Sequence, residues 1–132
     1  MSNIIVIVSD IKSCDSLHIV KFDFHGTTLS MMSLDLNEDI KVGVKVRLVV
    51  KPTHVALAKS FSGEISYSNQ LESTITSCEE GELLASIQLK VFDTHLESII
   101  TAKSSKRMNL KVGDRVTAFI KASELSIVEV VQ

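Results

Sequence analysis

The residues that could do chemistry in this chain are few, and the histidines raise the first question. The sequences FDFH (22–25) and FDTH (92–95) place His25 and His95 after similar Phe-Asp pairs. Such a pair could begin a metal site, but a complete site needs further Cys, His or carboxylate ligands at suitable spacing. The sequence offers none at that spacing. We therefore interpret both histidines as turn or strand-end residues and expect no metal-ion site.

The other reactive groups form no recognisable catalytic arrangement. Cys14 and Cys78 fit neither a metal-ligand spacing nor a disulfide framework, which favours two reduced thiols in the cytoplasm. The segment CEEGE (78–82) is typical of a hairpin turn with solvated carboxylates. The sequence has no Gly-rich phosphate loop, nucleophile elbow or zinc motif. We therefore expect a protein that is not an enzyme and that has no organic cofactor.

Two lysines stand in a pattern that the chain carries twice. The two copies lie 70 positions apart and are IKVGVKVRLVVKPTHVAL (40–57) and LKVGDRVTAFIKASELSI (110–127). Lys51 in the first copy and Lys121 in the second stand at the same place. The same ungapped shift matches Ile5 with Ile75, Phe22 with Phe92, His25 with His95, and Met1 with Leu71. A common register over so much of the chain indicates an internal duplication. We predict two lobes, residues 1–64 and 65–132.

Short alternating runs predict that each lobe consists mostly of strands. In the second repeat they cover residues 71–77, 83–92, 95–101, 115–121 and 125–131. KSSKRMNL (103–110) predicts one helical turn capped by Ser104 or Ser105, and SLDLNEDI takes its place in the first repeat. Closure would protect the edges of such small sheets. The predicted fold is all-β, with two small OB-like five-stranded barrels, each with a short helix.

Composition excludes several classes of partner. The formal net charge is −2, and neither half is basic, with seven Lys/Arg against seven Asp/Glu in residues 1–64 and seven against nine in residues 65–132. With five Phe, one Tyr and no Trp, the chain also lacks the aromatic platforms of single-strand nucleic-acid binding. NIIVIV (3–8) is too short for a secretory signal or a membrane span. We expect a cytoplasmic protein with neither nucleic acid nor membrane as partner.

The segment from Ser66 to Val131 resembles the Mop/TOBE family of small β-barrel domains, whose stand-alone members are the molbindins. The resemblance rests on SYSNQL (66–71) and, over many consecutive positions, on IITAKSSKRMNLKVGDRVTAFIKASELSI (99–127). The first repeat is similar chiefly through VGVKVRLVVKPTHVAL (42–57). The whole chain therefore resembles a tandem two-lobe molbindin.

This resemblance implies non-covalent binding of molybdate or tungstate where lobes or subunits meet. An oxyanion only accepts hydrogen bonds, so its shell needs hydroxyls, N–H groups and a cation, with molybdenum bound only as the oxyanion. Carried over by position, the binding residues are Ser66, Ser68, Asn69, Thr101, Ala102, Ser104, Lys121, Ala122 and Ser123, with Lys51 and Thr53 from the first repeat.

Two departures from the family pattern affect this expectation. Ser68 stands where the opening motif usually has Arg, and Pro52 lacks the N–H that Ala122 keeps. Since Met1 aligns with Leu71, the first repeat also lacks an opening motif, so we expect fewer anion sites than in a symmetric protein. His54, after KPT, reads as a surface histidine.

We expect a protein that stores, buffers or maintains molybdate or tungstate, as a homo-oligomer and by family resemblance a homotrimer. The alternative is a regulatory or adaptor protein of the same fold, whose output is a protein partner and whose oxyanion binding is weak or absent.

Overall fold

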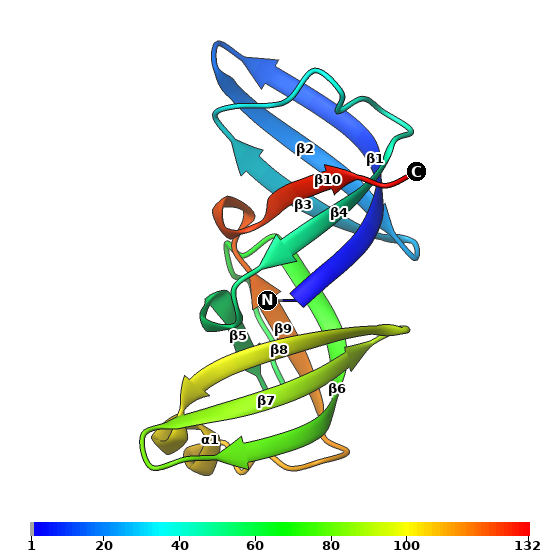
Figure 1. Cartoon of the computed structure of the whole chain (residues 1–132). Coiled ribbons are helices and arrows are strands. Elements are labelled where there is room, and N and C mark those ends of the chain that lie inside the picture. Colours follow the sequence, from blue (N-terminus) through cyan, green and yellow to red (C-terminus); the bar gives the residue numbers. More distant parts are fainter. Residues whose placement is uncertain (1) are drawn as a thin grey trace.

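A computed structural model describes residues 2–132, which form two antiparallel sheets of five strands each (Figure 1). In the first sheet the spatial order is β10-β4-β1-β2-β3. Its strands are β1 (Ser2–Cys14), β2 (Leu17–Phe24), β3 (Thr27–Ser33), β4 (Lys45–Val50) and β10 (Ser126–Val130).

The second sheet has the same arrangement, in the order β5-β9-β6-β7-β8. Its strands are β5 (Val55–Ala58), β6 (Asn69–Glu80), β7 (Leu84–Val91), β8 (Thr94–Thr101) and β9 (Arg115–Ile120). The predicted five-stranded, all-β architecture is therefore confirmed in both lobes.

The two repeats exchange their last strands. β5 follows the first repeat's β4 in the chain but pairs with β9, while β10 follows β9 and pairs with β4. Two single 3₁₀ turns make these crossings, η1 (Pro52–His54) and η2 (Ala122–Glu124). Each sheet thus contains four strands of one repeat and one of the other, so a division at residue 64 describes the sequence repeat but cuts across the sheets.

The predicted helix is present in the second lobe alone, which corrects the expectation of one in each. It is α1 (Ala102–Arg107), and its N-cap is Thr101, not Ser104 or Ser105, because the Thr101 hydroxyl accepts from the Ser104 N–H at 3.1 Å. In the first lobe, residues 34–44 between β3 and β4 have no helix.

Strand pairing explains this difference and corrects the repeat register. Val46 of β4 faces Val6 of β1, whereas its counterpart Val116 of β9 faces Ser73 of β6. Val6 and Ser73 are 67 positions apart, so the shift is 67 for the first three strands of each lobe and 70 only from β4 and β9 onward. The second repeat is three residues longer between its third and fourth strands, and α1 is built there.

The matches of Ile5 with Ile75, Phe22 with Phe92, and His25 with His95 are therefore coincidental. In the structure His25 corresponds to Phe92: each begins a hairpin turn with positive φ, 50° and 55° respectively. Leu71 corresponds to Ile4 rather than Met1, which itself lies outside the described residues, and Asn69 corresponds to Ser2.

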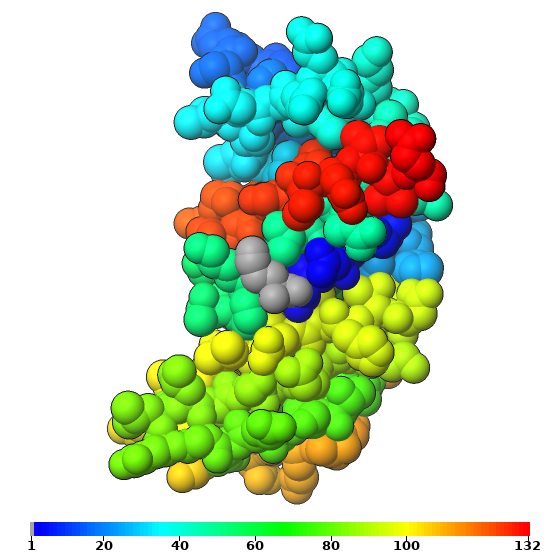
Figure 2. Space-filling view, in the orientation of Figure 1, coloured from blue at the N-terminus to red at the C-terminus, as the bar shows by residue number. Residues whose placement is uncertain are grey.

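The core follows from the strict alternation of the strands. In β1, Ile4, Val6 and Val8 are buried while Ile5 and Ile7 between them remain about 40% exposed. The buried residues of both sheets form one continuous apolar cluster that crosses the waist between the lobes. In the space-filling view the start of β1 fills this waist between the C-terminal strand and β8 (Figure 2). The two lobes consequently share a core.

Candidate functional site

The two strand crossings give the molecule a pair of matching turns. Lys51 precedes η1 with φ/ψ of −73°/139°, and Lys121 precedes η2 with −69°/141°. Pro52 and Ala122 occupy the same first position of their turns, and no side chain caps either turn. The KPT and KAS segments thus adopt one backbone conformation, and they differ at the N–H that proline lacks.

Beside these turns lies a cleft of about 410 Å³ in the second lobe. Its polar lining comes from Thr53 and His54 of η1, Tyr67 of the opening motif, Lys121 directly before η2, and Glu124 of η2. β8 contributes the wall of the cleft through Ile99 and Ile100. Of the eleven predicted binding residues, the cleft brings together Lys121 and Thr53.

Lys121 is the free cation of this cleft. Its side chain is exposed, and among residues 2–132 no carboxylate lies within 4.0 Å of its ammonium group. The neighbouring carboxylate, Glu124, is instead held by His54, with 2.8 Å between Glu124 Oε2 and His54 Nδ1. The cleft therefore presents an ammonium group and the Thr53 hydroxyl to solvent.

The opening motif reaches the cleft through Tyr67. Tyr67 is half-buried and packs edge-on against Phe119, with 6.0 Å between the ring centroids, and its carbonyl accepts a hydrogen bond from Gln70 Nε2. Ser66 and Ser68 on either side are exposed and do not line the cleft. Their hydroxyls remain available to a ligand or to a second chain.

Asn69 has a structural task that differs from the predicted one. It is fully buried, and its side-chain amide both accepts from the Ser30 N–H at 2.7 Å and donates to the Ser30 carbonyl at 2.9 Å. Its counterpart Ser2 makes the equivalent contact from the first lobe to the second: the Ser2 hydroxyl accepts from the Glu97 N–H at 2.9 Å. Asn69 thus joins the two lobes, and it is not among the residues that line the cleft.

Three further predicted residues gather at the start of α1. Thr101 caps the helix, and its hydroxyl also donates to Ser104 Oγ at 2.9 Å. Ala102 is buried at 3% exposure. None of the three lines the cleft beside Lys121, although Ile100 directly before them does. Their observed contacts are those of a helix N-terminus.

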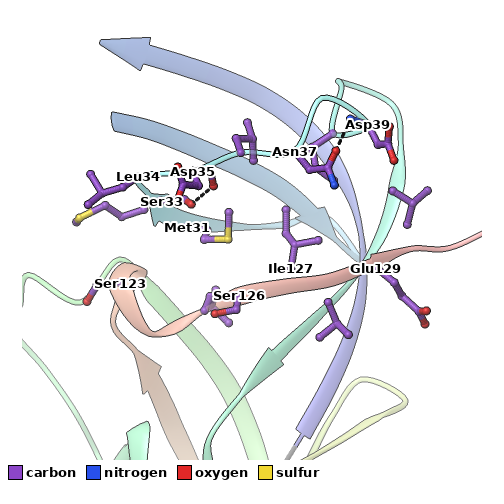
Figure 3. Close-up of a pocket in the computed structure, with 16 residues that line it drawn as sticks. Met31, Ser33, Leu34, Asp35, Asn37, Asp39, Ser123, Ser126, Ile127 and Glu129 are labelled. Atoms are coloured by element: carbon purple, nitrogen blue, oxygen red, sulfur yellow. Dashed lines mark hydrogen bonds between the residues drawn. The ribbon is translucent and has the colours of Figure 1, made fainter. Parts of the chain in front are cut away.

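The last predicted residues face other surroundings. Ser123 lies at the margin of a second cleft of about 680 Å³, which is lined by β10 and the segment from Met31 to Ile40 (Figure 3). This cleft occupies the first-lobe position that α1 covers in the second lobe. Ala122 is half-buried and Lys51 is exposed, and neither lines the cleft beside Lys121.

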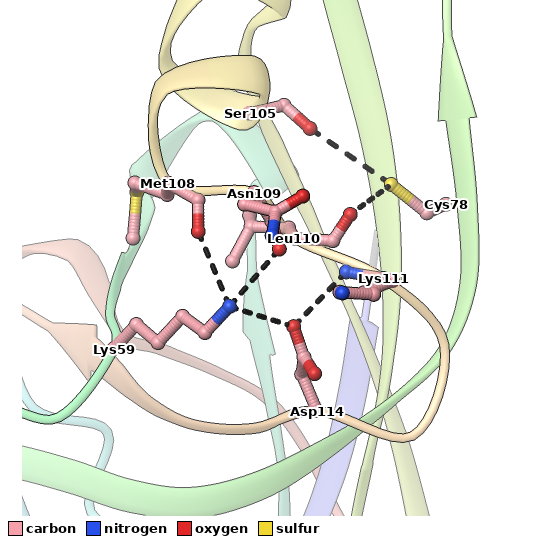
Figure 4. A network of polar contacts seen from close by, with 8 residues as sticks. All are labelled: Lys59, Cys78, Ser105, Met108, Asn109, Leu110, Lys111 and Asp114. Carbon is pink, nitrogen blue, oxygen red and sulfur yellow. Dashed lines mark hydrogen bonds and ion pairs between the residues drawn. The ribbon is translucent and has the colours of Figure 1, made fainter.

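Sequence reasoning missed a polar network that holds α1 in place (Figure 4). Lys59 Nζ donates to the carbonyls of Met108 and Asn109 at 3.2 and 3.0 Å and pairs with Asp114 Oδ2 at 3.0 Å. The hydrogen bond from Lys59 lowers the pKa of Asp114 below its ordinary value of 3.8, against the opposing effect of desolvation. The network stabilises the fold and is not part of the cleft. The spacing of Lys59 and Asp114 in the sequence does not predict that they pair.

The histidines and cysteines are not gathered into a centre. His25 pairs with Asp93 at 3.2 Å. Among residues 2–132, no three His, Cys, Asp or Glu side chains are arranged to hold a metal ion, and no helix is long and apolar enough to cross a membrane. Tyr67, His54 and Glu124 are the polar cleft residues that were not predicted. The signals available for them were the place of Tyr67 in the opening motif and the spacing of 70 between His54 and Glu124 in the repeat.

Comparison with known proteins agrees with this architecture. Residues 65–127, which make up most of the second repeat, match the TOBE domain family. The similar solved structures include two molybdate-binding proteins, while none of the curated proteins matches the sequence.

The first is the cytoplasmic molybdate-binding protein ModG with molybdate bound, which is 27% identical, with a TM-score of 0.89 over 95% of this chain and 93% of that chain. The second is a molybdate-binding protein from Sporomusa ovata, 34% identical over 51% of this chain and 100% of that chain, with a TM-score of 0.49.

Proposed function

We propose that this chain is a cytoplasmic protein that binds molybdate, or the similarly sized tungstate, reversibly and without covalent chemistry. The observation that carries this proposal is the similarity to molybdate-bound ModG, because it extends over nearly the whole of both chains. The TOBE domain of residues 65–127 agrees with it. The proposed role is storage or buffering of the oxyanion.

The chemistry of the cleft beside Lys121 supports this role. A tetrahedral dianion accepts hydrogen bonds at all four oxygens, and charge-assisted bonds to it contribute about 1.5–3 kcal/mol each. Lys121 supplies an unpaired ammonium group, and Thr53 supplies a hydroxyl from the other repeat. The site that we propose therefore draws on both repeats, and both must be in place to form it.

One chain does not supply enough donors to surround the anion. Asn69 is engaged with Ser30, and Thr101 and Ser104 are engaged at α1, whereas Ser66, Ser68 and Ser123 are exposed outside the cleft. We propose that exposed hydroxyls of a second chain complete the shell in a homotrimer. Because Pro52 removes an N–H from the first-repeat turn, we also propose fewer sites than two equivalent ones per chain.

Calorimetric titration of the purified chain with sodium molybdate tests the proposal, together with metal analysis and the mass in solution. We expect saturable binding and a trimer mass, with sulfate competing weakly. Lys121→Ala should weaken binding at least about tenfold, since it removes one charge-assisted contact. Lys21→Ala, at an exposed position on β2, is the matched control and should bind as the wild type does.

The proposal would be contradicted if the purified protein contained no molybdenum or tungsten and its melting temperature did not change when either anion was added. The adaptor function would then account for the chain better.

A further inference from the structure

The cleft beside Lys121 contains a group that is unfavourable for an oxyanion, namely the carboxylate of Glu124. Glu124 is half-exposed, with 36% of its side chain accessible, and it lines the same cleft as the lysine. A carboxylate at this place repels a dianion, and it could also pair with Lys121 and mask the only free cation of the cleft. The pairing with Lys121 is not formed in the structure, where Glu124 Oε2 lies 2.8 Å from His54 Nδ1 instead.

The pair joins equivalent positions of the two repeats. His54 is the third residue of η1 and Glu124 is the third residue of η2, 70 positions later. The two lobes are related by an approximate twofold rotation, and η1 and η2 lie next to each other. The third residue of one turn therefore contacts the third residue of the other. Two repeats identical here would bring two glutamates together, whereas His54 in the first repeat turns the contact into an attractive one.

We propose that His54 is a positioning residue for oxyanion binding, which holds the Glu124 carboxylate away from Lys121 and from the bound anion. This inference rests on the proposed function and names a residue outside the set that the family motif supplies. His54 acts through Glu124: its ring nitrogen Nδ1 lies 2.8 Å from Glu124 Oε2 and keeps the carboxylate on the His54 side of the cleft. Removing His54 releases a negative group into the cleft.

The proposal predicts a specific pattern of rescue. His54→Ala should weaken molybdate binding about tenfold, the effect of one partly screened charge near a dianion. Glu124→Gln alone should bind at least as tightly as the wild type, because the repelling group is gone. The double variant His54→Ala/Glu124→Gln should return to within about threefold of Glu124→Gln, since His54 has no other task in the site.

The experiment is calorimetric titration of the full chain with sodium molybdate at low and high salt, with thermal unfolding of each variant as a check on folding. The loss in His54→Ala should shrink at high salt, because screening weakens the released repulsion. His25→Ala is the matched control, because it removes a second exposed histidine–carboxylate pair, that with Asp93, which does not line the cleft. It should leave the affinity unchanged.

Three results would overturn the proposal while the function stands; the first two concern His54 and the third concerns Glu124. One is a His54→Ala affinity equal to that of the wild type, and the other is a double variant as weak as His54→Ala, which would make His54 a direct or purely structural contributor. A weaker Glu124→Gln would likewise show that the carboxylate helps binding. Failure of the wild type itself to bind molybdate would remove the proposed function and this inference with it.

Discussion

At the residue scale, the role of a polar side chain depends on whether its hydrogen bonds are already taken. Lys121 and Asn69 both belong to the predicted binding set, yet one is exposed and unpaired while the other is fully buried with both ends of its amide bonded to Ser30. Their positions in the motif do not distinguish them. Only the register of the neighbouring lobe, which brings β3 against the start of β6, reveals the difference.

Asn69 should therefore matter more for stability than for the anion. Asn69→Ala leaves the N–H and carbonyl of the half-buried Ser30 without the side-chain partner that they have in the wild type, and we expect a loss of about 1–3 kcal/mol in the free energy of unfolding. Asn69→Asp should be worse, since a carboxylate oxygen would face the Ser30 carbonyl. Urea unfolding measures both, with Gln70→Ala at the exposed neighbour as control. A stability equal to the wild type's in Asn69→Ala would refute the bridging role.

The pairing of Asp114 with Lys59 should appear in the acid stability of the protein. Lys59 lowers the pKa of Asp114 in the folded state, so the unfolded chain binds the proton first as the pH falls. The contribution of the pair is complete above the ordinary Asp pKa of 3.8 and is lost as the pH falls through the lower folded value. In a plot of melting temperature against pH, the wild type should lose stability as the pH falls below about 4. Lys59→Met and Asp114→Asn should each make this fall less steep.

Glu38→Gln, at an exposed glutamate without an ion-pair partner among residues 2–132, serves as the control for this series. It should keep the wild-type acid limb. An unchanged slope in both Lys59→Met and Asp114→Asn would show that other carboxylates govern acid unfolding.

At the scale of elements, local patterns predicted the strands well, because alternation of apolar residues is a local property. The runs at 83–92, 95–101 and 115–121 correspond to β7, β8 and β9 with small changes at their ends. The repeat register was wrong for the first three strands, because an ungapped comparison cannot reveal a three-residue insertion between β8 and β9. The strand exchange is a property of long-range pairing that no local pattern records.

The same insertion makes Thr101 a cap, and this can be separated from anion binding. Thr101→Ala removes the acceptor of the Ser104 N–H and should lower the free energy of unfolding by about 1 kcal/mol, while Thr101→Ser should retain most of it. Chemical denaturation gives the stability, and titration with molybdate gives the affinity. If Thr101→Ala reduced the binding free energy for molybdate by more than it reduced the free energy of unfolding, Thr101 would be a binding residue and not only a cap.

At the scale of the whole molecule, the exchanged strands make the lobes depend on each other. β9 is covered by β5 of the first repeat, and β4 is covered by β10 of the second. The lobes also share a core cluster. We infer that they unfold together, and that the cleft beside Lys121, which draws Thr53 from one repeat and Lys121 from the other, is formed by that exchange.

This dependence predicts the behaviour of the second repeat alone. In a fragment of residues 65–132, β9 lacks β5 and β10 lacks β4, and each exposed edge favours pairing with another chain. Ile127 occupies the repeat position of Leu57, which lies opposite Ala118. The fragment should therefore form a dimer in which β10 of each copy pairs with β9 of the other.

Light scattering should give twice the fragment mass, and a shorter fragment ending at Leu125, which lacks β10, should not dimerise. The dimer would bring two copies of Glu124 together where the full chain has His54 and Glu124, so Glu124→Gln should tighten it, most clearly at low salt. A folded monomeric fragment would show that strand exchange is not needed to complete the sheet. An unchanged dimer affinity in Glu124→Gln would show instead that the equivalent turns do not meet, and that the attraction between His54 and Glu124 is incidental to how the repeats assemble.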